Sequence, residues 1–320
     1  MKKLRAAVIG VGYLGNFHAQ KYAALESVDL IAVSDSDQKR CAEIAANLDC
    51  AAVADYRQLV GRVDAVSIVV PTVMHFEVAS FFLKHGIHIL LEKPVTRTVT
   101  EADELIALAT AKGTVFQVGH LERFNPALDA VRGEIDTPWL IEARRVAPYK
   151  PRGTDVSIVL DLMVHDIDLV TTLIDAEITS ITACGAAVYS ETADIANARI
   201  GFANGSFANL TASRISPVGD RSMQIYQRDT FINLDFQNRK AAITRNGTLN
   251  PETSVPEVSI EEISVPARDQ ILAEIEAFVY AINSGSAPAV TGNDGKRALE
   301  TALRIEEEIK RNTRLLKGEG

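Results

Sequence analysis

The chain has few cysteines, and their spacing suits neither a disulfide framework nor a metal ribbon. Only three of its 320 residues are cysteine, Cys41, Cys50 and Cys184, and no two of them form a C-x-x-C pair. Three cysteines cannot all pair with one another, so a reducing, cytoplasmic location is expected. With 47% hydrophobic residues, the chain is long and apolar enough for two domains with their own cores.

Long apolar runs and basic stripes are missing as well. The start of the chain, MKKLRAAVIGVG, has basic residues and then an apolar run that glycines soon interrupt. Such a run is too short for a signal peptide or a membrane span, and it predicts a strand. The formal net charge is −9, and the basic residues are scattered among acidic ones. Neither a membrane nor a nucleic acid is therefore expected as a partner.

Up to about Gly119, short β-branched runs alternate with longer amphipathic stretches. This alternation predicts an α/β Rossmann domain over residues 1–121, with a doubly wound parallel sheet between helices. Helices are expected at 77–85 and 100–112 among others. The expected strands are Leu4–Ile9, Leu30–Ser34, Ala65–Val70, His88–Leu91 and Val115–Val118.

After Pro126 the apolar runs are joined by turns, which predicts an α+β domain over residues 122–320 for substrate binding and oligomerisation. Its largely antiparallel open sheet would be backed by helices at about 159–174, 269–283 and 294–314, with an exposed loop at 246–257. One face of such a sheet is open to a partner subunit, so a homodimer or homotetramer is expected. The expected strands are WLIEARRV, ITSITACGAAVY, ANARIGF, GSFANLTAS, SMQIYQ, FINLDF and KAAITR.

A glycine-rich loop follows the first predicted strand, where VIGVGYLG places Gly10, Gly12 and Gly15 in G-x-G-x-x-G spacing. These glycines suit a tight turn, the close approach of a pyrophosphate, and helix packing. Twenty residues past Gly15, Asp35 ends the next strand, where a carboxylate can accept hydrogen bonds from ribose hydroxyls. A carboxylate also repels a 2′-phosphate, and no arginine follows immediately. NAD is therefore expected rather than NADP.

Two segments carry candidate catalytic groups. The run IHILLEKPV puts Glu92, Lys93 and Pro94 at the carboxyl end of a parallel strand, where open α/β sheets place their ligand crevice. A solvated surface lysine is the alternative reading of Lys93. In LDLMVHDIDLV, Asp161 and His165 stand four residues apart and so share one helix face. Such a pair suits an oriented general base, two metal ligands or a local surface pair.

Other polar groups in and near these segments give weaker signals. No dense His/Cys cluster supplies further metal ligands, so no metal is expected. Asp166 suits the solvated face of its helix. VGHLERFNP places His120, Arg123 and Asn125 at the junction of the predicted domains, where they are candidates for substrate binding. A structural ion pair of Arg123 between the two domains is the alternative.

Together, these segments resemble the Gfo/Idh/MocA family of oxidoreductases over nearly the whole chain. PTVMHFEVASFFLKHGIHILLEKPV is similar to the family's segment of proline, histidine, helix and E-K-P. LDLMVHDIDL is similar to its D-x-G-x-H-x-x-D motif, with Met163 where glycine is usual. The resemblance implies a catalytic set of Lys93, Asp161 and His165, cofactor contacts from Gly10, Gly12, Tyr13, Leu14, Gly15, Asp35, Pro71, Thr72, His75, Glu92 and Lys93, and substrate contacts from His120, Arg123, Asn125 and Asp168.

The implied activity is a dehydrogenase that passes hydride from a secondary hydroxyl of a sugar or sugar nucleotide to NAD. Either His165 takes the hydroxyl proton and Lys93 hydrogen-bonds the oxygen, or the two roles are exchanged. The phrases GVGYLGNFHAQKYAAL and VGHLERFNPAL most resemble a branch that oxidises the 3-hydroxyl of a UDP-linked sugar. Cations and hydrogen-bond donors for the diphosphate would then come from Arg123, Asn125, Arg144, Arg145, Lys150 and Arg152. Ordinary strand and loop charges are the alternative reading of these residues.

Two alternatives to this activity stay open. One is a dehydrogenase of the same fold that acts on a free polyol, an inositol or a dihydrodiol. The other is a regulator that binds NAD without turnover. The presence of Lys93, Asp161 and His165 argues against the regulator, because a sensor needs no set of groups for proton transfer.

Overall fold

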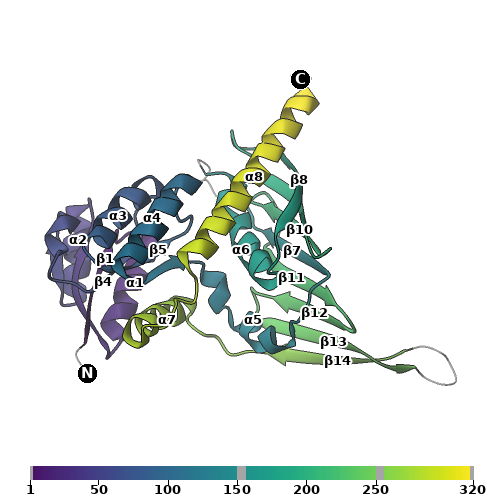
Figure 1. The fold of residues 1–320 in the computed structure, drawn as a ribbon, viewed down its shortest axis with the longest axis horizontal. Coiled ribbons are helices and arrows are strands. Elements are labelled where there is room, and N and C mark those ends of the chain that lie inside the picture. Colours follow the sequence, from purple (N-terminus) through teal and green to yellow (C-terminus); the bar gives the residue numbers. More distant parts are fainter. Residues whose placement is uncertain (1–2, 150–155, 250–255, 318–320) are drawn as a thin grey trace. The chain divides into compact units, whose positions relative to one another are not determined.

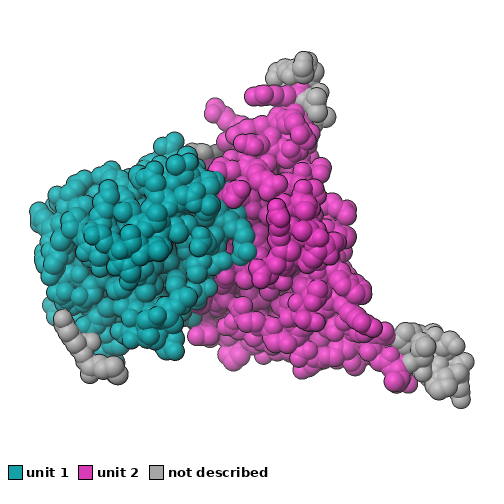
Figure 2. Space-filling model, in the orientation of Figure 1, with its two compact units in different colours: residues 1–121, 269–299 teal, residues 122–268, 300–320 magenta. Residues whose placement is uncertain are grey.

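The computed structural model describes residues 3–149, 156–249 and 256–317. The chain divides into two compact units (Figure 2). The first contains Met1–Leu121 and Asp269–Leu299, and the second contains Glu122–Arg268 and Glu300–Gly320. Among the described residues, no helix is both long and apolar enough to cross a membrane.

The first unit is built on a six-stranded parallel sheet in the order β3-β2-β1-β4-β5-β6 (Figure 1). The order reverses between β1 and β4, so the predicted doubly wound Rossmann fold is confirmed. All four residues of β4 are buried, as expected for a central strand covered on both faces. The strands are β1 Leu4–Ile9, β2 Val28–Ser34, β3 Ala51–Val53, β4 Ala65–Ile68, β5 His88–Glu92 and β6 Phe116–Gly119. The helices are α1 Tyr13–Ala24, α2 Gln38–Asn47, α3 His75–Lys84 and α4 Val99–Lys112, with short 3₁₀ helices η1 Tyr56–Leu59 and η2 Thr72–Met74.

A late helix, α7 Gln270–Ser284, also belongs to the first unit. Its apolar face contributes Ile275, Phe278 and Val279 to the core that contains Tyr22 of α1. The division of the chain into residues 1–121 and 122–320 is therefore corrected for Asp269–Leu299. Helical periodicity shows that a segment has an apolar face, but it does not show which core buries that face.

The second unit contains an eight-stranded sheet in the order β14-β13-β12-β11-β7-β10-β9-β8. Only the pair β7 and β10 is parallel, so the predicted largely antiparallel α+β architecture is confirmed. The strands are β7 Leu140–Val146, β8 Ile178–Ala186, β9 Ile195–Phe202, β10 Phe207–Ser213, β11 Asp220–Gln227, β12 Thr230–Asp235, β13 Lys240–Leu249 and β14 Pro256–Ser264. The helical segments are η3 Leu121–Phe124, α5 Pro126–Val131, η4 Arg132–Glu134, the π-helix η5 Val159–Met163, α6 Val164–Leu173 and α8 Gly292–Lys317, the last of which passes from the first unit to the second at Leu299.

The predicted bounds of the loop at residues 246–257 are wrong, because both ends belong to strands. β13 continues to Leu249 and pairs with β14 from Pro256 onward. Residues 250–255 lie outside the described part of the chain. Charged and polar residues along β14 hid its strand pattern, because this edge strand is largely exposed.

The large sheet has two different faces. On β7, Ile141, Ala143 and Arg145 are buried on the side that meets α6. Glu142 and Arg144 point the other way, as the two-residue period of a strand requires. Their face carries a polar hollow lined by Glu142, Arg144, Asn197, Arg199, Asn209, Thr211, Asp220, Ser222 and Gln224 among others.

Candidate functional site

The glycine loop between β1 and α1 has the geometry that a bound pyrophosphate requires. Gly10 has a φ of +85°, and a Cβ there would lie 2.6 Å from the Val69 carbonyl oxygen. A Cβ at Gly15 would overlap the Gly10 carbonyl oxygen. Gly12 is the N-cap of α1, and a Cβ there would meet nothing within 4 Å. The loop is therefore closely packed behind and open at the helix N-terminus, where amide groups favour an anion.

Asp35 follows β2 and is held from three directions. The Val11 amide donates to its Oδ2 at 2.7 Å, the Asp37 amide donates to its Oδ1 at 2.8 Å, and the Arg40 guanidinium donates to the same Oδ1 at 2.9 Å. Burial raises the pKa of Asp35, but these hydrogen bonds outweigh burial and lower the pKa. The carboxylate therefore stays ionised and fixed at the end of β2.

The position of Arg40 contradicts one step of the argument for NAD. Because no arginine follows Asp35 immediately in the sequence, none was expected near its carboxylate. Asp37, however, caps α2 by accepting a hydrogen bond from the Arg40 amide, and the first helical turn returns the Arg40 side chain to Asp35. A helical turn brings together residues that the linear sequence separates.

A cavity of about 680 Å³ adjoins the glycine loop and Asp35. Gly10, Gly12 and Pro71 line it, as do Arg40, Tyr56 and Arg57, which belong to no motif of the sequence. The last two lie on η1, directly after Asp55, which accepts a hydrogen bond from the Arg57 amide. That capping aspartate is the sequence signal for the turn. The shape, the glycines and the ionised Asp35 fit an NAD molecule.

We expect Asp35→Ser to shift the cofactor preference of the protein from NAD toward NADP. Without the carboxylate, the ribose hydroxyls lose an acceptor, and Arg40 is released to pair with a 2′-phosphate. The ratio of kcat/KM for NAD to that for NADP should fall at least about tenfold, which corresponds to about 1.4 kcal/mol. Asp37→Ser is the matched control, since serine can also cap α2. An unchanged ratio in the Asp35 variant would contradict the assignment.

The other predicted cofactor residues lie around this loop and at the ends of β4 and β5. Tyr13 and Leu14 begin α1, with Tyr13 largely exposed and Leu14 half-buried, and Thr72 opens η2. His75 is buried, and its ring nitrogens lie 2.8 Å from the Pro94 carbonyl oxygen and 2.9 Å from that of Val70. His75 therefore links the end of β4 to the turn after β5.

The E-K-P segment leaves the carboxyl end of β5 as predicted. Glu92 is nearly buried, and its Oε2 accepts a hydrogen bond of 3.3 Å from the Lys93 amide. Lys93 is half-buried, so the fully solvated reading of this lysine does not apply.

In the second unit, Asp161 lies on η5, and His165 lies in the first turn of α6. The prediction of a regular α-helix from about residue 159 is wrong for residues 159–163, which form a π-helical turn before α6 begins. Both side chains are half-buried, whereas Met163, at the family's usual glycine position, is fully buried. The Ser157 hydroxyl accepts hydrogen bonds from the first amides of this turn. Single π-turns occur often at functional sites, where they alter the direction of nearby side chains.

Four polar groups predicted to face solvent or substrate, Arg123, Arg145, Asp166 and Asp168, form buried or half-buried ion pairs within the second unit. Asp168 accepts two hydrogen bonds from Arg123, at 2.6 and 2.7 Å. Asp166, predicted to be solvated, is 2% exposed and pairs with Arg145, which also contacts Glu122 at 3.1 Å. Arg123 therefore has an ion-pair partner within its own unit.

The remaining candidates for substrate binding are also engaged or buried. Asn125 caps α5 and donates to Glu122 and to the Phe236 carbonyl, so its contacts indicate a structural role. His120 is 1% exposed. Arg144 pairs with Asp220 on the open face of the sheet, at 3.2 Å. Lys150 and Arg152 lie outside the described residues.

Comparison with known proteins identifies the class of this fold and site. Residues 4–120 match a family model described as an oxidoreductase family with an NAD-binding Rossmann fold. Residues 127–230 match the GFO/IDH/MocA C-terminal domain.

Individual relatives cover nearly the whole chain. The UDP-N-acetylglucosamine 3-dehydrogenase of Acidithiobacillus ferrooxidans is 40% identical over 95% of this chain and 97% of its own. A solved structure of that enzyme superposes with a TM-score of 0.91 at 39% identity, covering 97% of this chain and 99% of its own. The myo-inositol 2-dehydrogenase of Thermotoga maritima is 26% identical over 92% of this chain and 93% of its own.

One relative with a solved structure contains the cofactor. The scyllo-inositol dehydrogenase of Lactobacillus casei, with bound NAD(H) and scyllo-inositol, has a TM-score of 0.81 at 20% identity, covering 97% of this chain and 98% of its own, which shows a shared fold. The family match and the fit of the glycine loop agree on NAD as the cofactor. The chain therefore belongs to the Gfo/Idh/MocA family of NAD-dependent oxidoreductases.

Proposed function

We propose that this enzyme oxidises the 3-hydroxyl of UDP-N-acetylglucosamine to a ketone with NAD as the hydride acceptor. The supporting observation is the similarity to the Acidithiobacillus ferrooxidans dehydrogenase, which runs along 95% of the chain at 40% identity. The inositol dehydrogenases reach only 25–27% identity over comparable lengths. A nucleotide sugar is therefore favoured over a free polyol as the substrate.

The residues of the proposed catalytic set have separate roles. His165 takes the proton of the substrate hydroxyl, because imidazole acts as a base near neutral pH with little tuning. Asp161, one turn earlier, orients that imidazole. Lys93 donates a hydrogen bond to the oxygen as it becomes a carbonyl, or exchanges roles with His165. NAD, when bound, supplies the acceptor for the hydride that leaves the same carbon.

The contacts within the second unit change how substrate binding is proposed. Arg123 and Asp168 form an ion pair, so we propose that they hold η3 against α6 rather than contact the substrate. His120, which directly follows β6, is still proposed as a residue that positions the substrate.

The test is a substrate panel. The purified protein is incubated with NAD and, in parallel, UDP-N-acetylglucosamine, free N-acetylglucosamine and myo-inositol, while NADH absorbance and product mass are followed. We expect NADH and a 3-keto product only with the UDP-linked sugar. Turnover with myo-inositol alone would overturn the substrate and retain the reaction class. No turnover with any of these substrates would favour the regulator.

We also propose a homodimer or homotetramer, as the open sheet face suggests, in a reducing cytoplasm. Asn197 and Thr211 form a hydrogen bond of 2.9 Å on that face. Thr211→Arg should disturb a partner packed there and shift the molar mass by light scattering toward the monomer. Thr110→Arg, on an exposed site of α4, is the control. A wild-type monomer at micromolar concentration would contradict the proposal.

A further inference from the structure

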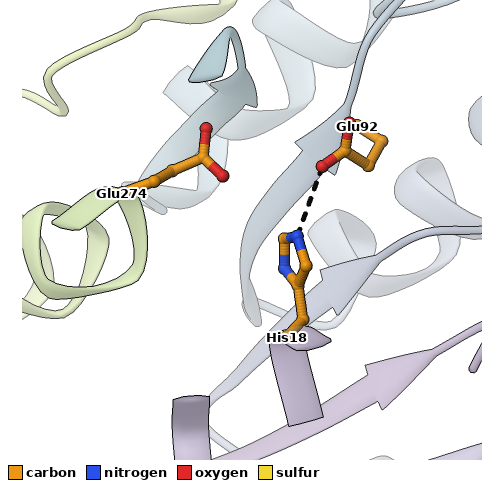
Figure 3. A group of neighbouring side chains, drawn as sticks. All are labelled: His18, Glu92 and Glu274. Carbon is orange, nitrogen blue, oxygen red and sulfur yellow. Dashed lines mark ion pairs between the residues drawn. The ribbon is translucent and has the colours of Figure 1, made fainter. Parts of the chain in front are cut away.

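Three ionisable side chains meet inside the first unit, each from a different element (Figure 3). They are His18 on α1, Glu92 at the end of β5, and Glu274 on α7. One nitrogen or oxygen atom from each lies within 4.8 Å of the others. His18 and Glu274 are each 1% exposed, and Glu92 is 9% exposed. Uncompensated charge in such a place is costly, so the protonation of the cluster has to be explained.

The number of protons decides the charge of the cluster. With neutral His18 and two carboxylates, the interior would hold two negative charges. With His18 protonated and one carboxyl neutral, the three groups carry no net charge. Neither carboxyl oxygen of Glu274 has a hydrogen-bond partner among the described residues. Burial, aided by the charge of Glu92, raises the pKa of Glu274 well above its usual range. Burial and the charge of Glu92 therefore both favour the protonated form of Glu274.

A chain of close polar contacts connects this cluster to Lys93. Tyr22 Oη lies 2.9 Å from Ser67 Oγ, which lies 3.2 Å from His18 Nδ1. His18 Nε2 lies 3.3 Å from Glu92 Oε1. The other carboxyl oxygen of Glu92 accepts the hydrogen bond from the Lys93 amide. One oxygen of Glu92 therefore lies beside the His18 ring, while its second oxygen accepts from the backbone of Lys93.

The packing around Glu92 leaves its carboxyl little freedom. A Cβ at Gly119 on β6 would lie 3.0 Å from Glu92 Cδ, so only glycine leaves room for the carboxyl there. Gln117, also on β6, donates to the Glu274 carbonyl oxygen at 3.0 Å and fixes this part of α7. Tyr22 is a further ionisable group near Glu274, and burial raises its pKa, so it stays uncharged. The arrangement is pre-organised by three elements packed against one another.

We propose that His18, Glu92 and Glu274 form a buried proton-sharing triad that positions Lys93 for the reaction. This proposal rests on the catalytic role proposed above for Lys93. The three groups act as positioning residues, because they act through the Lys93 backbone. A divalent metal held by the same three groups is the competing occupant.

The first test measures the proton on Glu274 without using activity. The Glu274 pKa in the folded protein is above its unfolded value, so its contribution to stability is present at low pH and is lost as the pH rises toward the folded value. Glu274→Gln removes this loss. The melting temperature of the variant, relative to wild type, should therefore rise between about pH 5 and about pH 8. Glu276→Gln, exposed on the same helix, is the matched control and should show no such trend.

Two outcomes of this test would overturn the triad. A constant difference between the Glu274 variant and wild type across this pH range would show that no proton is held there. A fall in the wild-type melting temperature on adding a chelator, absent in Glu274→Gln, would show a bound metal instead.

The second test addresses the positioning of Lys93. His18→Leu removes the ring beside Glu92, and Ser67→Ala is a milder variant that removes the shared partner of His18 Nδ1 and Tyr22 Oη. In both variants we expect faster hydrogen exchange at the Lys93 amide and a lower kcat, with the KM for NAD changed less than about twofold. Wild-type exchange at Lys93 in both variants would overturn the positioning role, whatever the turnover. Unchanged turnover in Lys93→Met would instead overturn the proposed function of Lys93, which separates the two failures.

Discussion

Lys93→Met is expected to lower kcat by about 10²- to 10⁴-fold, the range found for a positioned acid–base or hydrogen-bonding group. This loss corresponds to about 3–5 kcal/mol of transition-state stabilisation. Methionine keeps the length and apolar stem of lysine but removes its three donors. Since Lys93 lies beyond the end of β5 and outside the cavity next to Asp35, NAD affinity should change only a few-fold. The measurements are steady-state kinetics with the substrate identified by the panel and a fluorescence titration with NAD.

His165→Asn should lower kcat to a similar extent, because asparagine has no basic nitrogen to take the hydroxyl proton. The pH profile separates the two roles. If His165 is the base, the decline of kcat at acid pH should disappear in this variant and persist in Lys93→Met. Lys84→Met and His85→Gln change exposed residues of the same types and should have wild-type kinetics. Wild-type turnover in both active-site variants would refute the catalytic set.

The order of the elements could be predicted from the sequence because each signal was local. The glycine spacing, the strand before it and Asp35 at the end of the next strand follow directly from period and spacing. The structure places all three as expected. Lys93 likewise leaves the end of a parallel strand. For this part of the site, local sequence was sufficient.

The buried charges could not be predicted in the same way. Asp166 was expected in solvent because its own helix gives no apolar signal at that position, yet its partner Arg145 is 21 residues away on β7. A carboxylate is rarely buried unless it is paired with a cation, and tertiary packing decides which cation lies beside it. The sequence near the carboxylate therefore does not show that it is buried. The same reasoning applies to Arg123 and Asp168, which form an ion pair although they stand 45 residues apart in the sequence.

Glu274 shows a signal that the sequence does contain. It lies three residues after Ile271 and four before Phe278, on the stripe of α7 that joins the core. A carboxyl on an apolar stripe needs a partner or a proton. His18 occupies the corresponding position on α1, four residues before the buried Tyr22. Polar residues within otherwise apolar helix faces are therefore informative even where the partner is unknown.

Arg145→Met is expected to destabilise the second unit by about 3–5 kcal/mol, the cost of leaving a buried charge without its partner. Burial works to lower the pKa of Arg145, but the attraction of Asp166 and Glu122 outweighs it and raises the pKa. The guanidinium is therefore charged, and its loss leaves two buried carboxylates close together. Urea unfolding followed by circular dichroism would measure the change.

The neighbouring Arg144 provides the matched control for this prediction. It lies on the same strand but faces the other way, is half-exposed, and pairs with the partly exposed Asp220. Arg144→Met should therefore change the free energy of unfolding by no more than about 1 kcal/mol, as for other surface ion pairs. Equal losses in the two variants would mean that β7 tolerates no change in side-chain shape. A large loss in Arg145→Met alone, partly restored by adding Asp166→Asn, would show that the unpaired carboxylate is the cause.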